Sequence, residues 1–231
     1  MPQRSQAVLE PRKSPVQARS AASVDAILEA TIQVLLQVGK ERLTTTKVAL
    51  RAGVSVGTLY QYFPNKSALL KAALKRHLEK ITDAVERVCQ EQRGRSLEQM
   101  VTALMTTFLE AKMKDANASV ALYAVSSDVE GAKIAQETAN RSTKAVAGIR
   151  STKAVAGIRS TKAVAGMLKS TRDRLTTDPH LVASVIQGVM VGVSRRLLES
   201  DAAQKQYDLL RRETIFLACA YVNACSEREE T

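Results

Sequence analysis

Apolar residues recur along most of this chain at intervals of three and four, which is the spacing of one face of an α-helix. The spacing predicts a first helix over residues 23–38, a long helix over residues 65–88, and a second helical region that begins near Ser96. Further helices are expected over residues 179–198 and 203–224. The buried face of the first helix is expected to comprise Val24, Ile27, Leu28, Thr31, Leu35 and Val38. The pattern therefore predicts an all-α protein.

Two short helices joined by a tight turn are predicted within residues 44–66. Thr44 suits the cap of the first helix, Gly53 suits the left-handed backbone of a sharp reversal, and Ser55 suits the cap of the second helix. The second helix ends at Phe63, because the residue before a proline is disfavoured in the α region. This layout is typical of a DNA-binding helix-turn-helix, whose second helix enters the major groove.

Within and just after this segment stand Val48-Ala49, Ala52-Gly53-Val54-Ser55, Gly57-Thr58-Leu59-Tyr60, Tyr62-Phe63, Asn65-Lys66 and Leu69-Leu70. At this unbroken spacing, they resemble the signature of TetR-family transcriptional regulators over roughly residues 20–75. The resemblance implies an N-terminal helix-turn-helix head followed by a larger helical ligand-binding and dimerisation domain. We therefore expect a disordered basic arm at residues 1–19, a DNA-binding head at 20–66 and a regulatory and dimerisation domain at 67–231.

The charge distribution agrees with a DNA-binding head. The chain has a formal charge of +11, and residues 1–80 contribute +8 of it. Such a basic excess suits a polyanion, and we expect no membrane partner because we find neither a membrane-spanning run nor a secretory signal. Three cysteines in no metal-ligand spacing favour a reduced compartment, so we expect a cytoplasmic, nucleoid-associated protein. The arm is either a solvated tail or a basic segment that contacts phosphates or the minor groove.

The expected DNA contacts lie in the two short helices and at the start of the next helix. Thr58 can hydrogen-bond a base and touch a thymine methyl group, and Gly57 allows the backbone to come close. Tyr60, Tyr62 and Lys66 suit phosphates, as the resemblance also implies. The expected DNA-binding residues are Thr44, Thr45, Lys47, Ser55, Val56, Gly57, Thr58, Tyr60, Gln61, Tyr62 and Lys66.

Two alternatives remain open for these residues. Tyr60 and Tyr62 could instead pack the interior of the head, where Leu59 and Phe63 are expected. Because the side chains at Val56 and Gly57 offer few hydrogen-bond donors, much of the sequence reading could come from Thr58, Lys47, Gln61 and DNA shape.

Small residues spaced by four form a ridge on the predicted helix over 179–198. A glycine in a helix interior costs about 1 kcal/mol, so the close approach of another helix would explain the ridge. The resemblance implies that the last two helices form a two-fold, four-helix dimer interface. The expected interface residues are Ser184, Gly188, Gly192, Leu210, Leu217 and Tyr221. The alternative is packing inside one chain.

The resemblance also implies a small, apolar inducer of unknown identity. Residues that could line its cavity are Met100, Met105, Phe108, Met113, Leu122 and Tyr123. The alternative for each is an ordinary place in the core. No cofactor or metal is expected, because His77 and His180 stand alone, without metal-ligand spacing.

The predicted function is therefore a ligand-responsive repressor that binds a palindromic operator as a homodimer. We expect no enzyme, because the chain has no glycine-rich phosphate loop and no nucleophile elbow. One alternative is a constitutive DNA-binding protein without an inducer. The other is a helical protein-interaction module.

A nine-residue stretch, RSTKAVAGI at 141–149, recurs at 150–158 and at 159–167, where Met167 replaces the final isoleucine. Such close repetition indicates a tandem duplication. Eighteen residues make about five helical turns and nine make about two and a half, so in a continuous helix the middle copy faces the opposite way. The alternative is a flexible bulge, because each copy contains a glycine.

Overall fold

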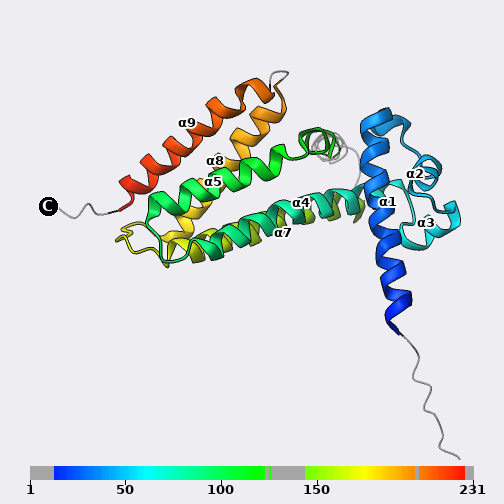
Figure 1. Cartoon of the computed structure of the whole chain (residues 1–231), viewed down its shortest axis with the longest axis horizontal. Coiled ribbons are helices and arrows are strands. Elements are labelled where there is room, and N and C mark those ends of the chain that lie inside the picture. The colour runs from blue at the N-terminus through cyan, green and yellow to red at the C-terminus, as the bar shows by residue number, and fades with distance from the viewer. Residues whose placement is uncertain (1–12, 123–124, 126–143, 201–202, 227–231) are drawn as a thin grey trace, which may run out of the picture. The chain divides into compact units, whose positions relative to one another are not determined.

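The computed structural model of the chain describes residues 13–122, 125, 144–200 and 203–226 (Figure 1). The described residues are predominantly helical, and the extended backbone among them pairs only in an isolated bridge between Leu175 and Ser226. The chain divides into two compact units, Met1–Leu69 and Leu70–Thr231, close to the expected boundary at residue 66. The prediction of an all-α fold is confirmed.

The first unit contains α1 (Lys13–Arg42), α2 (Thr45–Ala52), α3 (Val56–Tyr62) and the first residues of α4 (Lys66–Glu91). α2 packs against α1, and α3 packs against α2 (Figure 1). The interior of this unit is mainly aliphatic, and the Phe63 ring is also buried in it. Its buried residues include Ile27, Leu28, Thr31, Leu35, Leu43, Val48, Leu59, Phe63 and Leu69.

α1 begins earlier than the sequence pattern predicts. The predicted arm extends to residue 19, but residues 13–19 are helical, so that prediction is wrong over this stretch. The segment carries no glycine, and its alanine, glutamine and arginine residues favour helix. At the other end, Gly39 has φ 75° and interrupts the helix, as predicted. Residues 1–12 of the arm lie outside the described part of the chain.

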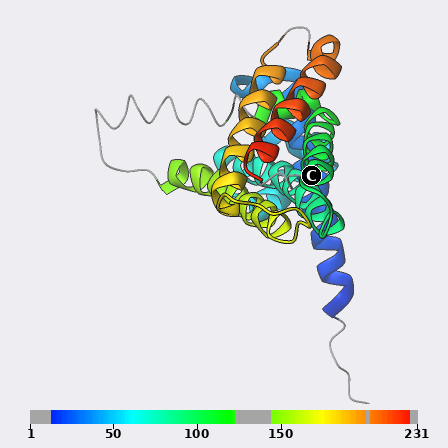
Figure 2. The same cartoon turned by 90° about the vertical axis from the view of Figure 1, so that its left-hand side faces the viewer.

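The second unit contains most of α4 together with α5 (Leu97–Met113), α7 (Lys144–Leu168), α8 (Pro179–Leu198) and α9 (Ala203–Ala224). α9 packs on α5, and α8 packs on both α7 and α9. α8 and α9 lie side by side in both views (Figures 1 and 2). One hydrophobic core joins all five helices, with Val85, Met100, Leu104, Met167, Ile186 and Val222 among its residues. The bounds of α8 and α9 agree with those predicted.

α7 shows how the repeat is accommodated. The helix is continuous over the described part of the repeat, residues 144–167, so the alternative of a bulge is wrong there. The third copy is packed, because Val164, Ala165 and Met167 are fully buried. Ile158, which ends the second copy, is instead 68% exposed. The prediction that neighbouring copies face opposite ways is confirmed at this position.

Two helical stretches, Ser20–Arg42 and Pro179–Leu198, have the length and mean hydropathy of a membrane span. The prediction that no apolar run approaches that length is therefore wrong. Core helices of soluble proteins also meet this criterion, and both stretches contribute residues to the interior of their own unit. Their length and composition are thus weak evidence for a membrane.

Candidate DNA-binding site

The helix-turn-helix is fixed by local hydrogen bonds of the kinds that its sequence predicts. The Thr44 side chain accepts a hydrogen bond from the Lys47 backbone N–H at 3.2 Å and caps α2. Gly53 adopts the left-handed conformation, with φ 69° and ψ 28°, and ends that helix. The Ser55 hydroxyl accepts a hydrogen bond from the Thr58 backbone N–H at 2.9 Å and caps α3. The start and direction of α3 are therefore set before any partner binds.

The two sides of α3 differ sharply in their exposure to solvent. Leu59 is fully buried, whereas Gly57, Tyr60 and Gln61 are exposed. Val56, Thr58 and Tyr62 lie at the margin and are half-buried. The exposed side of α3 is the surface that a major groove would meet, so the structure brings these predicted DNA contacts together on one face.

Two pairs of hydroxyl groups tie α3 to its surroundings. The Tyr60 hydroxyl lies 3.0 Å from Thr45 Oγ1, which links α3 to the start of α2. Ser55 Oγ lies 2.8 Å from Thr58 Oγ1. Each hydroxyl keeps a further hydrogen-bonding capacity, but its position is already fixed by its neighbour. Tyr60 is 48% exposed, so the alternative that it packs the interior of the head is wrong.

Lys47 and Lys66 have partners that the sequence did not predict. The Lys47 ammonium donates to the Arg42 carbonyl at 3.0 Å. The Lys66 ammonium donates to the Lys40 carbonyl, and it lies 3.5 Å from the Glu41 carbonyl. Both lysines therefore hold the turn between α1 and α2, where backbone carbonyls lack helical partners. This turn leads directly into the N-terminus of α2.

In the second unit, α8 and α9 present a surface of exposed apolar side chains. Ser184, Gly188 and Gly192, the predicted ridge, are all exposed, and a Cβ atom at either glycine would meet no atom of the chain within 4 Å. Leu217 is exposed, Leu210 is half-buried, and Tyr221 packs partly against its own core. Three further apolar residues that were not predicted, Leu181, Val185 and Val191, are exposed on α8. The signal that could have found them is their place beside the glycines on the same helix.

Most of the residues predicted to line an inducer cavity are buried. Met100, Met105, Phe108 and Leu122 are buried in the packed interior, and Met113 is half-buried. Tyr123 lies outside the described residues. A groove of about 500 Å³, lined by none of the other five predicted residues, lies between α4 and α7. It is lined by Glu86, Cys89, Gln90, Arg93, Arg159, Lys162, Ala163 and Gly166.

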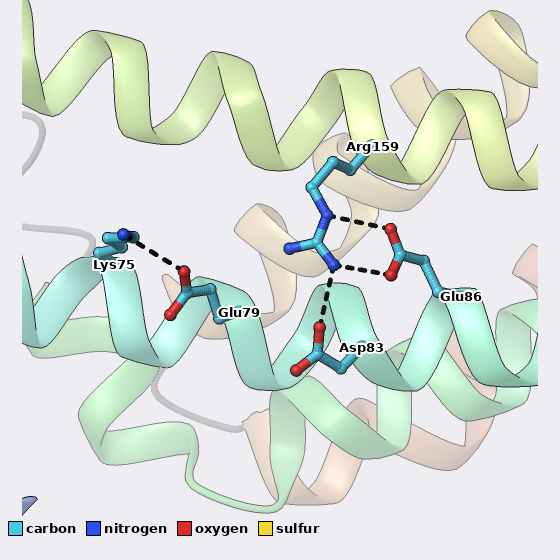
Figure 3. A network of polar contacts seen from close by, with 5 residues as sticks. All are labelled: Lys75, Glu79, Asp83, Glu86 and Arg159. Carbon is cyan, nitrogen blue, oxygen red and sulfur yellow. Dashed lines mark hydrogen bonds and ion pairs between the residues drawn. The ribbon is translucent and has the colours of Figure 1, made fainter. Parts of the chain in front are cut away.

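Arg159, an arginine of the repeat on α7, reaches toward Glu86 and Asp83 on α4 (Figure 3), and both Arg159 and Glu86 line this groove. The Arg159 guanidinium donates two hydrogen bonds to Glu86, at 3.0 and 2.6 Å, and a third to Asp83 at 3.1 Å. The bonds to Glu86, and then the bond to Asp83, raise the pKa of Arg159 further above its ordinary value. This contact was not predicted from the sequence. The spacing of Asp83 and Glu86 on one helix face was the available signal.

The buried histidine and the cysteines of the second unit have ordinary structural partners or none in metal-ligand geometry among the described residues. Among the described residues, no three His, Cys, Asp or Glu side chains gather as metal ligands. His77 is buried, and its Nε2 lies 3.0 Å from the Ser119 hydroxyl. Cys225 is buried, and Cys219 is half-buried with its sulfur 3.5 Å from Thr102 Oγ1.

The comparison with known sequences concerns the first unit. Residues 27–73 match the family model described as bacterial regulatory proteins of the tetR family. The HTH-type transcriptional repressor KstR of Mycolicibacterium smegmatis is 46% identical over 61 residues, which are 26% of this chain and 30% of KstR. The chain thus matches less than a third of the length of this curated relative.

Solved structures extend the similarity to the whole fold. A protein from Mesorhizobium loti described as a TetR-family transcriptional regulator superposes with a TM-score of 0.72 and 17% identity. The match covers 91% of this chain and 99% of that one. The SmeT–triclosan complex gives a TM-score of 0.58 at 18% identity, over 90% of this chain and 93% of SmeT. The N-terminal region of the chain thus matches the tetR family of bacterial regulatory proteins, and the chain as a whole shares the fold of these solved structures.

Proposed function

We propose that this protein is a transcriptional repressor that binds a palindromic DNA operator as a homodimer. The observation that carries the proposal is the exposed face of α3, where Gly57, Tyr60 and Gln61 lie opposite the buried Leu59. The match of residues 27–73 and the concentration of positive charge in residues 1–80 support it. The relatives are regulators rather than enzymes, and we place the protein in the cytoplasm, with the DNA.

We assign the contacts to two groups. Thr44, Thr45, Tyr60, Tyr62 and Lys66 bind phosphates and set the position of the head on the duplex. Lys47 and Ser55 support that placement from the turns beside α2 and α3. Val56, Gly57, Thr58 and Gln61 face the base edges. The hydrogen bond between Thr45 and Tyr60 supports this division, because it joins two phosphate contacts from different helices.

The proposed dimer forms through α8 and α9. Phe216 is 71% exposed, and Leu181, Leu209 and Leu217 are more than half exposed, so an apolar surface is available to a second copy. The open space at Gly188 and Gly192 supports close approach of the partner's helix. Two-fold symmetry would place two α3 helices in successive major grooves, about 34–36 Å apart.

We also propose that a small apolar molecule releases the DNA. Triclosan is bound by SmeT, which shares the fold, and the groove between α4 and α7 has the volume of a drug-sized ligand site. The constitutive alternative is favoured if Met100, Met105 and Phe108, which were expected to line the site and are buried, belong to the core alone.

The test is selection of genomic fragments on the purified protein, followed by affinity measurements across a salt series. Binding that releases counterions weakens steeply with salt, by a slope of about −0.9 in log K per phosphate contacted. We expect one palindromic sequence and a steep slope. No enriched sequence, or an affinity independent of salt, would sink the proposal and favour a protein-interaction module. Release of the fragment by triclosan or another apolar compound would separate the inducible repressor from the constitutive one.

A further inference from the structure

Among the side chains of α3 that face the base edges, one can form two hydrogen bonds with a single base. We infer that Gln61 contacts an adenine, and so selects an A·T base pair, while the bare backbone at Gly57 brings it within reach of the base edge. The inference rests on the proposed DNA-binding function, and it adds the residue and the base.

The composition of α3 limits which bases its side chains can recognise. Side chains that form two hydrogen bonds with one base are Arg and Lys on guanine and Asn and Gln on adenine. α3 reads VGTLYQY, and the structure describes all seven residues. It contains no Arg, Lys or Asn, so Gln61 is its sole side chain of this kind. Two-bond recognition of guanine from α3 is therefore unavailable, and recognition of adenine is available once.

The geometry of α3 points the Gln61 side chain away from the protein. At about 100° per residue, Gln61 lies about 200° around the helix from Leu59, and Gly57 lies about 160° from Leu59 in the same sense, so the two residues are about 40° apart on the side opposite Leu59. Both residues are exposed, whereas Leu59 is fully buried. Within the described part of the chain, no hydrogen bond engages the Gln61 amide. Its donor and acceptor are thus free for a base.

The neighbouring hydroxyl groups already have partners within the chain, although each keeps some further hydrogen-bonding capacity. The Thr58 hydroxyl lies 2.8 Å from Ser55 Oγ, at the cap of the helix. The Tyr60 hydroxyl lies 3.0 Å from Thr45 Oγ1, toward the N-terminus of α2. Reorienting either hydroxyl toward a base would break a bond that positions α3. Gln61 carries no such cost.

Gly57 provides a second, independent observation. A Cβ atom built there would meet only Ser55 Oγ, at an ordinary contact distance of 3.7 Å. The chain itself therefore does not require glycine, although a glycine inside a helix is unfavourable. A surface outside the chain that approaches the backbone would explain the missing side chain. Gln61 stands one turn farther along the same face, so the approach that Gly57 permits brings Gln61 to the base pairs.

The experiment is selection of binding sites from random DNA by the full-length protein and by two variants, Gln61→Ala and Gln61→Glu. The wild type should require A·T at one position in each half-site, with a preference of about 5- to 150-fold. Gln61→Ala should lose that preference and keep the others. Gln61→Glu should shift the position toward C·G, because a carboxylate accepts a hydrogen bond from the cytosine amino group.

Gln37→Glu provides the matched control, because Gln37 is exposed on α1 and the substitution adds the same charge. It should select the wild-type sequence. If the wild type selects no common sequence, the proposed function fails. If the wild type selects a palindrome and Gln61→Ala selects the same palindrome with undiminished preference at every position, the assignment of Gln61 is overturned. Equal weakening at all positions would overturn it too, because it would indicate a general loss of binding.

Discussion

Ile158 and Met167 occupy the same position in successive copies of the repeat, yet Met167 is fully buried and Ile158 is 68% exposed. Nine residues separate them, which is about two and a half helical turns, so the two side chains leave α7 on opposite sides. The same local sequence therefore has two environments, and its contribution to stability should depend on the copy.

Substituting alanine at these two positions should separate the environments. Met167→Ala should lower the free energy of unfolding by about 2–5 kcal/mol, because it leaves a cavity in the packed core. Ile158→Ala, the matched control, should change it by less than about 0.5 kcal/mol, as is usual for surface positions. Urea denaturation of both variants measures the difference. Equal losses would mean that α7 has no preferred face.

Deleting whole copies tests the helical phase. Removal of residues 150–158 turns the upstream chain by about half a turn relative to the packed third copy, whereas removal of residues 141–158 restores the phase. We expect the one-copy deletion to melt at a lower temperature than the two-copy deletion, and the two-copy deletion to bind operator at least as well as the parent. If all three proteins melt together and bind equally, the phase argument is wrong.

A leucine in place of Gly188 should abolish the proposed dimer while leaving the subunit folded. The structure offers open space for the added side chain within one chain, so the only expected clash is with a partner. Gly157→Leu is the control, because a Cβ there also meets no atom but lies on α7, outside the proposed interface. Sedimentation should show a monomer for Gly188→Leu and a dimer for Gly157→Leu. A dimer in both variants would contradict the interface.

Lys66 should affect both the turn that it holds and the DNA. Lys66→Met keeps most of the aliphatic stem but removes the donor to the Lys40 carbonyl, so the melting temperature should fall. If another N–H of the Lys66 ammonium binds a phosphate, Lys66→Met should also reduce the steepness of log K against log salt by about 0.9 for each subunit. Lys75→Met, at an exposed lysine paired with Glu79, should change neither quantity. A lower melting temperature with an unchanged slope would leave Lys66 a structural role only.

Acid should destabilise the second unit through His77. Burial, and then the nearby charge of Lys112, lowers the pKa of His77 from 6.5 to about 4. Because the unfolded chain binds the proton more readily, stability should be lost as the pH falls from about 6.5 to 4, by up to about 3 kcal/mol. His77→Gln should remove most of this dependence, and the exposed His180→Gln should not. Urea denaturation at pH 7, 5.5 and 4.5 checks the prediction.

The helix-turn-helix could be predicted from the sequence because its determinants are local. Thr44, Gly53 and Ser55 act on backbone within a few residues, and each occupies the predicted cap in the structure. The buried face of α1 follows from periodicity alone, because Ile27, Leu28, Thr31 and Leu35 recur at helical spacing. The face of α3 with the candidate DNA contacts is set by the same periodicity around Leu59.

Only the tertiary structure decided which copy of the repeat is buried, because periodicity gives the angle between copies but not which of them meets the core. The same limit applies to Arg159, whose partners Asp83 and Glu86 lie on α4, far from Arg159 in the sequence. It applies to Lys47 and Lys66 as well, since the carbonyls that they bind are exposed by the turn at Gly39. Local sequence determined the helices and their caps. Contacts between segments far apart in the chain depend on how those helices pack, and they were decided by the fold.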